Sequence, residues 1–169
     1  MLDARKCISY WTIEHRGPIQ GAMRASIGTW IFGCDVCQDV CPFNRFAEET
    51  KWPEFRPEAG VGPRLDVVDV LGIADDTTFR ARFGQSAIRY AGRASLVRNA
   101  AIVAANLGAT TAVPWLVRRA REDAAPVVRG HALAALARLD RRAARAAADL
   151  ALHMDGDAFV RAEAAAVLI

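Results

Sequence analysis

Three of the four cysteines in the chain lie within eight consecutive positions. Cys34, Cys37 and Cys41 are spaced C-x2-C-x3-C, and Pro42 follows the last one directly. The second half of a bacterial ferredoxin iron–sulfur run has the same spacing and the same proline. A short, turn-rich loop lets neighbouring thiolates reach a common centre, and the proline ends any helix that would carry the last one away. The pattern favours ligation of 4Fe–4S clusters, with Cys7 far upstream as a further ligand.

Structural zinc is the main alternative, because four cysteines with one C-x2-C pair can form an all-thiolate tetrahedral site. Zinc sites usually show two such pairs, whereas this chain has one. Thiols that are simply buried are a third interpretation. The C-x3-C-P ending favours iron and sulfide over both.

The ferredoxin pattern also indicates how the ligands divide. In two-cluster ferredoxins the cysteine before the proline ligates the other cluster. Cys7, Cys34 and Cys37 would then bind one 4Fe–4S cluster, with Cys7 displaced upstream by an inserted helical segment. Cys41 would supply a single ligand to a second 4Fe–4S cluster. Both clusters would lack ligands, which predicts a missing N-terminal partner segment.

Polar residues near the cysteines have simpler interpretations than catalysis. For Asp35 and Asp39, which adjoin cluster ligands, local capping of the cysteine loop is favoured. His15 is expected at a helix end on the surface, and His131 and His153 are expected to pack or to face solvent within repeat helices. No residue is assigned a catalytic role.

Composition indicates a protein with ample material for a core, since 53% of its 169 residues are hydrophobic. Three of the first six residues are charged (Asp3, Arg5 and Lys6), unlike a secretory signal, so we expect a reducing cytoplasm. An uncharged run over residues 99–117 is long enough to suggest a membrane span. Gly108 and Pro114 interrupt it, so we predict two helices with a turn and no membrane.

The elements expected before the repeats are short and mainly α-helical. Gly28 should end the helix predicted just before it. Asp75 or Asp76 should cap a later helix that carries Phe79 and Phe83, and Gly84 should end that helix. The predicted segments are a helix over 2–15, a helix over 19–27, one helical turn over 35–40, an irregular connector over 48–64, an apolar stretch over 65–71 and the capped helix. The predicted organisation is a partial ferredoxin-like iron–sulfur segment (1–47), the connector (48–64) and a HEAT-like α-solenoid (65–169).

The solenoid is predicted from an internal repeat. Val-Arg pairs end at Arg98, Arg129 and Arg161, at intervals of 31 and 32 residues, and alanine and leucine follow each pair at helical spacing. Asp123 and Asp155 each lie six residues before an arginine of this set. We therefore expect the Asp123 and Asp155 side chains to pair with Arg129 and Arg161.

Charge is distributed unevenly although the net charge is only +3. Residues 48–76 carry eight acidic and three basic residues, whereas residues 79–121 carry eight arginines and no acidic residue. A basic segment of this kind can meet phosphates.

Longer strings of ordinary residues resemble one family, epoxyqueuosine reductase. They are residues 3–10 around Cys7, 12–19, 32–44 around the other three cysteines, and 79–83, 86–89 and 96–101 in the basic segment. The family comprises cobalamin-dependent iron–sulfur oxidoreductases that finish queuosine at the wobble position of tRNA. HEAT-like helices follow its ferredoxin-like part, as predicted here.

The resemblance implies functions that this chain would share only in part. Family members begin with a cobalamin-binding catalytic domain and a first motif C-x2-C-x2-C-x3-C-P, neither of which occurs here. Cysteines of that motif would complete both clusters. We therefore expect the chain to be a C-terminal portion, inactive alone and monomeric, that supplies cluster ligands and a surface for tRNA. The arginines expected to contact tRNA are Arg80, Arg82, Arg89, Arg93 and Arg98.

A different class of protein remains open at this point. The chain could be a non-catalytic interaction protein in which the cysteines hold one structural cluster or zinc and the HEAT-like part binds a partner. Metal analysis separates this class from the first, because stoichiometric zinc without iron would contradict the reductase interpretation.

Overall fold

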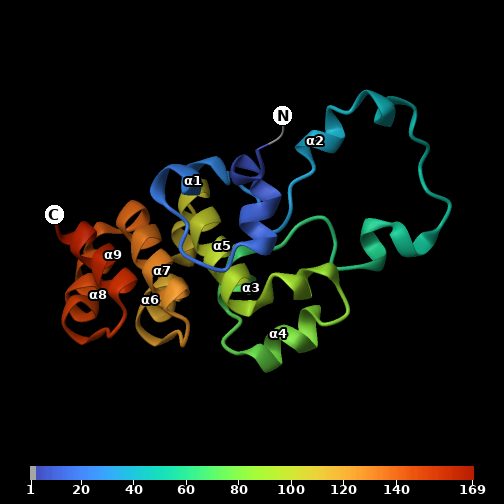
Figure 1. Cartoon of the computed structure of the whole chain (residues 1–169). Helices are drawn as coiled ribbons and strands as arrows, with labels where there is room; N and C mark the ends of the chain where they lie inside the picture. The colour runs from blue at the N-terminus through green and yellow to red at the C-terminus, as the bar shows by residue number, and fades with distance from the viewer. Residues whose placement is uncertain (1–2) are drawn as a thin grey trace.

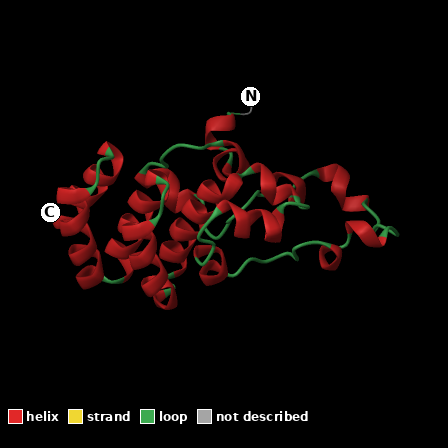
Figure 2. Ribbon diagram, turned by 90° about the horizontal axis from the view of Figure 1, so that it is seen from below, coloured by secondary structure: helices red, strands yellow, loops and turns green. Residues whose placement is uncertain are grey.

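The computed structural model describes residues 3–169, and within them it contains helices and turns but no strand (Figure 2). The mainly α fold predicted from the sequence is confirmed. The α-helices are α1 (Gly21–Ser26), α2 (Val36–Asp39), α3 (Val67–Leu71), α4 (Asp76–Phe83), α5 (Gly92–Leu107), α6 (Val113–Glu122), α7 (Pro126–Leu139), α8 (Arg141–Met154) and α9 (Ala158–Leu168). Short 3-10 helices span Ala4–Lys6, Pro42–Phe46, Pro53–Phe55, Pro57–Ala59, Ala87–Tyr90 and Thr110–Ala112, and a π-helix spans Tyr10–Glu14.

Helices α5 to α9 form the predicted α-solenoid (Figure 1). Helix α7 packs between α5 and α9 in one layer, and α6 and α8 pack against that layer as a second. The three Val-Arg pairs fall on α5, α7 and α9, so the sequence repeat marks the helices of the first layer. Each layer buries the apolar stripe of the other, which is how a stack of helix pairs builds a continuous core.

Helix α5 lies at the centre of the molecule. It contacts α7, α3, α4, α1 and the π-helix, and residues 95–105 are buried without interruption. It ends at Gly108, whose φ of 66° places it in the left-handed region, and α6 begins with Pro114 in its first turn. The uncharged run over 99–117 therefore forms two helices with a turn, as predicted. Among the described residues, no helix is both long enough and apolar enough to span a bilayer.

The continuous helix predicted over residues 2–15 is wrong, although residues 1 and 2 lie outside the described range. The 3-10 helix Ala4–Lys6 ends at Cys7, which has an extended backbone (φ −82°, ψ 120°). The carbonyls of Trp11, Thr12 and His15 accept hydrogen bonds from side chains of α5. These tertiary bonds replace part of a regular helical pattern, which local propensity could not reveal.

The helix predicted over 19–27 is shorter than expected but ends where predicted. Ile19 precedes α1, and its backbone N–H and C=O both face the His131 ring. Gly28, with φ 58°, follows the helix. Ile19, Ile27 and Ile31 are buried in the same apolar core as the solenoid helices. The segment that carries the cysteines is thus packed on the solenoid up to residue 31.

Beyond residue 33 the chain leaves that core. The segment with α2 and the connector projects away from the helices in a long excursion (Figure 1). Its large apolar side chains are exposed, among them Phe43, Phe46, Trp52 and Phe55. The connector is irregular apart from two 3-10 turns.

The chain returns to the core through two capped helices. Asp66 caps α3 by accepting hydrogen bonds from two backbone N–H groups, and Asp75 caps α4 by accepting from the N–H of Thr78 (2.7 Å). Helix α4 buries Phe79 and Phe83 and is followed by Gly84. Of the two caps predicted for this helix, Asp75 is the one that forms.

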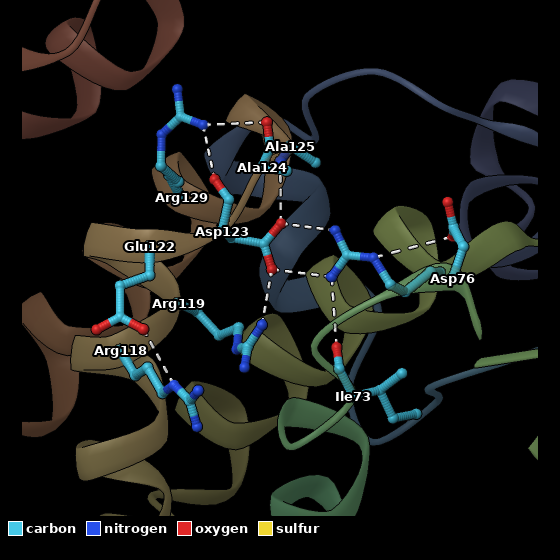
Figure 3. A network of polar contacts seen from close by, with 10 residues as sticks. Ile73, Asp76, Arg118, Arg119, Glu122, Asp123, Ala124, Ala125 and Arg129 are labelled. Atoms are coloured by element: carbon cyan, nitrogen blue, oxygen red, sulfur yellow. Dashed lines mark hydrogen bonds and ion pairs between the residues drawn. The ribbon is translucent and has the colours of Figure 1, made fainter. Parts of the chain in front are cut away.

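Acidic residues at the turns of the solenoid pair differently from the prediction. The Asp123 carboxylate accepts hydrogen bonds from Arg93 (2.7 and 2.9 Å) and Arg119 (3.1 Å), as Figure 3 shows around Asp123. Arg129 donates to the backbone oxygen of Asp123 (2.8 Å), and its ion pair is with Asp155 (2.6 Å).

The next turn repeats this arrangement, because Arg161 donates to the backbone oxygen of Asp155 (2.9 Å). The predicted side-chain pairs Asp123–Arg129 and Asp155–Arg161 are therefore wrong. Each carboxylate pairs with an arginine from an earlier helix of the stack, and only the backbone oxygen meets the arginine six residues later.

Candidate metal centre

The four cysteines lie at turns and helix ends. Cys7 follows the first 3-10 helix, and its carbonyl accepts from the N–H of Trp11 (3.3 Å). Cys34 precedes the single turn of α2, Cys37 lies within that turn, and Cys41 directly precedes the 3-10 helix that begins with Pro42. The helical turn predicted over 35–40 is present as Val36–Asp39.

All four thiols are free, and Cys37 is exposed while the other three are half-buried. Among residues 3–169, no three His, Cys, Asp or Glu side chains lie close enough together to hold one metal ion. The structure thus does not gather the four cysteines around a single ion. Free thiols on turns nevertheless provide the donor chemistry that iron–sulfur clusters require, so the residues present fit such a group.

Gly33, which directly precedes Cys34, has a backbone conformation that favours glycine. Its φ is 72°, in the left-handed region, which other residues rarely adopt. Its backbone N–H donates to Oγ1 of Thr12 (3.0 Å), and the Thr12 hydroxyl donates in turn to the carbonyl of Ile8 (2.9 Å). A hydrogen-bonded link therefore joins the residue after Cys7 to the residue before Cys34.

Helix α5 holds the same two segments through adjacent side chains. Nδ2 of Asn99 donates to the carbonyls of Thr12 and Ile31, both at 2.9 Å. Arg98 donates to the carbonyls of Trp11 (2.9 Å), His15 (2.9 Å) and Gly17 (2.7 Å). The helical turn that follows Cys7 and the backbone three residues before Cys34 are therefore both bonded to one turn of α5.

Other solenoid residues hold the part of this segment that carries no cysteine. Nδ2 of Asn106 donates to the carbonyls of Arg24 (2.8 Å) and Gly28 (2.9 Å). Arg24 also forms an ion pair with Glu163 of α9. These contacts fix α1 against the solenoid.

His131 is a buried histidine that joins α7 to Ile19. Its Nδ1 lies 2.7 Å from the carbonyl of Val127, and its Nε2 lies 3.0 Å from the N–H of Ile19. These contacts suit a neutral ring that donates from Nδ1 and accepts at Nε2. Burial, reinforced by the positive charge of Arg24, lowers the pKa of His131 to about 3. The expectation that His131 packs inside the repeat is confirmed.

This histidine should make the fold acid-sensitive. Below pH 6.5 the unfolded chain binds a proton at this position, whereas the native state does not until the pH nears 3. Stability should thus fall by about 1.4 kcal/mol per pH unit as the pH drops from 6.5 toward 4.5. Urea titrations across this range measure the slope. In His131→Gln this slope should fall by the contribution of about one proton. An unchanged slope in that variant would contradict a neutral native ring.

Asp35 and Asp39 do not cap the cysteine loop. Asp35 occupies the position before α2, but its side chain makes no capping hydrogen bond, and only its backbone oxygen accepts, from Gln38 and Asp39. Asp35 instead lines a cavity of about 610 Å³, together with Trp30, Phe32 and Arg64. The capping interpretation of these two carboxylates is therefore wrong.

The other two histidines lie near helix ends. His15 is half-buried, and its ring meets the Trp11 ring at 4.4 Å. His153 is exposed in the last turn of α8. The surface position predicted for His15 is thus wrong in part, because α5 and Trp11 cover it, whereas His153 faces solvent as expected.

The arginines predicted to contact tRNA fall into two groups. Arg80, Arg82 and Arg89 are exposed. Arg93 and Arg98 are 6% and 0% exposed, so the prediction that they contact tRNA is wrong. They lie on α5, which other elements surround, and their guanidinium groups bond to Asp123 and to backbone carbonyls.

Sequence reasoning also missed Thr12, Asn99, Asn106 and His131 as residues that hold the cysteine segment. A signal was available for part of this set, because residues 100–105 of α5 are all apolar and so cover every side of the helix. A helix of that kind is enclosed, so polar side chains within it must find buried partners.

Comparison with known proteins connects this arrangement to a family. Residues 1–44, which contain all four cysteines, match the family model described as a 4Fe–4S double cluster binding domain. The epoxyqueuosine reductase of Xanthomonas campestris pv. campestris is 41% identical over 138 residues, which cover 80% of this chain and 38% of that protein. A protein of Geobacillus stearothermophilus, described as an uncharacterized protein in the gldA 3′ region, is 32% identical over 163 residues, which cover 96% of this chain and 74% of that protein.

A solved structure is also similar to this chain in fold. The crystal structure of an epoxyqueuosine reductase with an epoxyqueuosine-modified tRNA-Tyr stem loop has a TM-score of 0.87 and 28% sequence identity, and it matches 99% of this chain and 44% of that chain. The fold and the cysteine segment define an all-helical protein in which a segment of the 4Fe–4S double-cluster type packs on an α-solenoid. The chain belongs to the epoxyqueuosine reductase family. It spans less than half the length of the two relatives that bear this name.

Proposed function

We propose that this chain is the C-terminal portion of an epoxyqueuosine reductase and provides cluster ligands and a tRNA-binding surface. Cys7, Cys34 and Cys37 ligate one 4Fe–4S cluster, and Cys41 ligates a second. The observation that carries the proposal is that the double-cluster family model covers the four free cysteines. Ligands from another segment complete both clusters, because each cluster binds four thiolates.

The clusters, when bound, would supply one-electron transfers toward the epoxide, whose oxygen leaves as water when the two carbons gain a double bond, a change that takes two electrons and two protons. The residues of this chain contribute position and environment. Gly33 and Thr12 place the backbone before Cys34, and α5 fixes that backbone against the solenoid. Cobalamin binding and proton delivery belong to the remaining part of the family proteins in this proposal.

Metal analysis tests the assignment on the chain reconstituted anaerobically with iron, sulfide and an excess of a small thiol, which stands in for the fourth ligand of the cluster on Cys7, Cys34 and Cys37. We expect bound iron and sulfide with an electron paramagnetic resonance signal after reduction. Cys37→Ser should remove the same signal as Cys7→Ser and Cys34→Ser, because these residues share one cluster. Cys41→Ser should leave that signal in place, since it serves the other cluster. Zinc at one equivalent with no iron would contradict the proposal and favour a structural zinc protein.

The proposed tRNA surface rests on exposed arginines of the described chain. Arg89 lies over the ring of Tyr90 at 5.0 Å, and Tyr90 is itself 60% exposed. An exposed aromatic ring beside a guanidinium can stack on an unpaired base while the cation meets phosphate. Arg80 is exposed as well, whereas Arg82 is partly neutralised by Asp69 at 3.3 Å. A related protein of this family has been crystallised with a tRNA stem loop, which supports RNA as the partner.

Neutralising Arg80 and Arg89 should therefore weaken binding to a tRNA anticodon stem loop. The double variant Arg80→Gln/Arg89→Gln should lower the slope of log affinity against log salt by about 1 for each phosphate that the protein no longer neutralises. Fluorescence anisotropy over a salt series measures both quantities. Arg118→Gln is the control, because Arg118 is exposed in the same basic segment but paired with Glu122 at 3.1 Å. Equal losses of affinity in both variants would contradict a specific surface at Arg80 and Arg89.

A further inference from the structure

The Thr12 hydroxyl connects the two cysteine-bearing segments at the positions next to their cysteines. It donates to the carbonyl of Ile8, which follows Cys7, and it accepts from the N–H of Gly33, which precedes Cys34. The Thr12 side chain is fully buried, and its two backbone partners, Ile8 and Gly33, are half-buried at the edge of the core. A single side chain thus sets the separation of two backbone positions that are 25 residues apart in sequence.

Asn99 makes a second connection between the same segments. Its Nδ2 group bridges the carbonyls of Thr12 and Ile31, and its Oδ1 accepts from Nε and Nη2 of Arg98 (3.1 and 2.9 Å). The amide therefore has its oxygen turned to the guanidinium and both donors turned to the carbonyls, so its orientation is fixed. Asn99 is fully buried as well. Two buried side chains, Thr12 and Asn99 of α5, therefore hold the stretch that follows Cys7 and the stretch that precedes Cys34 in one relative position.

We propose that Thr12 and Asn99 are positioning residues for the cluster that Cys7 and Cys34 share, so that α5 sets the spacing of its ligands. This inference rests on the proposed function, because it requires that the two cysteines serve one cluster. Residues behind the ligands determine how well a metal group is held and how its environment is tuned. Hydrogen bonds of a buried side chain to the backbone next to both ligands reduce the freedom that ligation would otherwise have to remove.

The chain offers a matched control for Asn99. Asn106 lies two turns further along α5, and its Nδ2 bridges two backbone carbonyls at 2.8 and 2.9 Å, as Asn99 does. Those carbonyls belong to Arg24 and Gly28, which lie ten and six residues before Cys34, whereas Ile31 lies three residues before it. Asn99→Ala and Asn106→Ala therefore remove the same kind of contact from the same helix, but only the first releases both the helical turn after Cys7 and the backbone close to Cys34.

The test compares four variants of the reconstituted chain: Thr12→Val, Thr12→Ser, Asn99→Ala and Asn106→Ala. We expect Thr12→Val and Asn99→Ala to speed loss of iron to a chelator about 10-fold or more and to alter the resonance signal of the cluster. Thr12→Ser retains the hydroxyl and should behave like the wild type. Asn106→Ala should lower thermal stability without changing either cluster readout. Equal cluster effects in Asn99→Ala and Asn106→Ala would overturn the inference.

A second measurement separates this inference from the proposed function. Hydrogen exchange of the Gly33 amide in the metal-free chain should accelerate in Thr12→Val and Asn99→Ala, and not in Asn106→Ala. If the wild type bound zinc and no iron even with added thiol, the proposed function would fail, and the exchange result would still report on the linkage of the two segments. Slow exchange at Gly33 in all variants would overturn the inference whatever the iron content.

Discussion

Asp123→Ala should destabilise the protein by about 3–5 kcal/mol, because it leaves two buried arginines without their carboxylate. Arg93 donates to both Asp123 oxygens, and Arg119 donates to one of them (Figure 3). The side chains of both arginines are less than 10% exposed, and that of Asp123 is inaccessible. Removing one partner of a buried ion pair costs more than the pair itself contributes, since the remaining charge has no solvent.

The Asp123 carboxylate is charged in the native state despite its position. Burial alone raises its pKa, but hydrogen bonds from Arg93, from the N–H of Ala125 and from Arg119 outweigh burial and lower the pKa below its usual range. Stability from this carboxylate is therefore present above about pH 4 and is lost as the pH falls through its native pKa. Denaturant titration at pH 7 measures the full effect of the substitution.

Two controls sharpen this result. Asp155→Ala removes the corresponding acid at the turn after α8. Its partner Arg129 is 16% exposed, so the loss of stability should be smaller. Arg93→Met/Asp123→Leu removes both partners of the strongest pair and should restore part of the stability that Asp123→Ala loses. A loss below about 1 kcal/mol for Asp123→Ala, typical of exposed pairs, would show that water reaches the network in solution.

The solenoid could be predicted from the sequence because its signature, a Val-Arg pair at the same place in a helix, occurs three times. The Val-Arg pairs recur at a nearly constant interval, and each falls on a helix of the same layer. Gly108 and Pro114 then mark the turn between α5 and α6 through local backbone preferences. These features depend on neighbours in the sequence, so they could be predicted without knowing the fold.

Ion-pair partners could not be predicted in the same way. The spacing between Asp123 and Arg129 suggested a local pair, yet the carboxylate turns to Arg93, which is 30 residues away. The prediction identified the right acids and turns but assigned the backbone contact to the side chain. Which arginine reaches a carboxylate depends on how successive helices stack, and a repeat interval does not contain that information.

The cysteine segment shows the same division between local and tertiary information. The turn of α2 and the break at Pro42 follow from residue types. The break at Cys7 does not, and neither do the bonds from α5 to the carbonyls of Trp11 and Thr12 in the turn that follows, because these bonds join residues far apart in the sequence. The ligand division among the cysteines stays a prediction, as does the domain division at residues 47 and 64.

Arg98→Met should loosen the cysteine segment selectively while the solenoid stays folded. Arg98 is fully buried and donates to three carbonyls of this segment, those of Trp11, His15 and Gly17. Burial, together with the nearby charge of Arg16, lowers the pKa of Arg98 to about 10, so the group remains charged at neutral pH. Methionine can fill much of the space but leaves the three carbonyls without a donor. At about 1–3 kcal/mol for each unsatisfied group, the expected cost is about 3 kcal/mol or more.

The repeat itself supplies the comparison, because Arg161 occupies the same Val-Arg position on α9 and donates to one backbone oxygen, that of Asp155. Arg161→Met should cost about 1 kcal/mol and leave the cysteine segment unchanged. Limited proteolysis should cut Arg98→Met within residues 7–18 well before it cuts α6 to α8, whereas Arg161→Met should resist cleavage there. Cooperative loss of the whole fold in Arg98→Met would contradict a selective effect. It would show that α5 needs the cysteine segment as much as that segment needs α5, as their shared core allows.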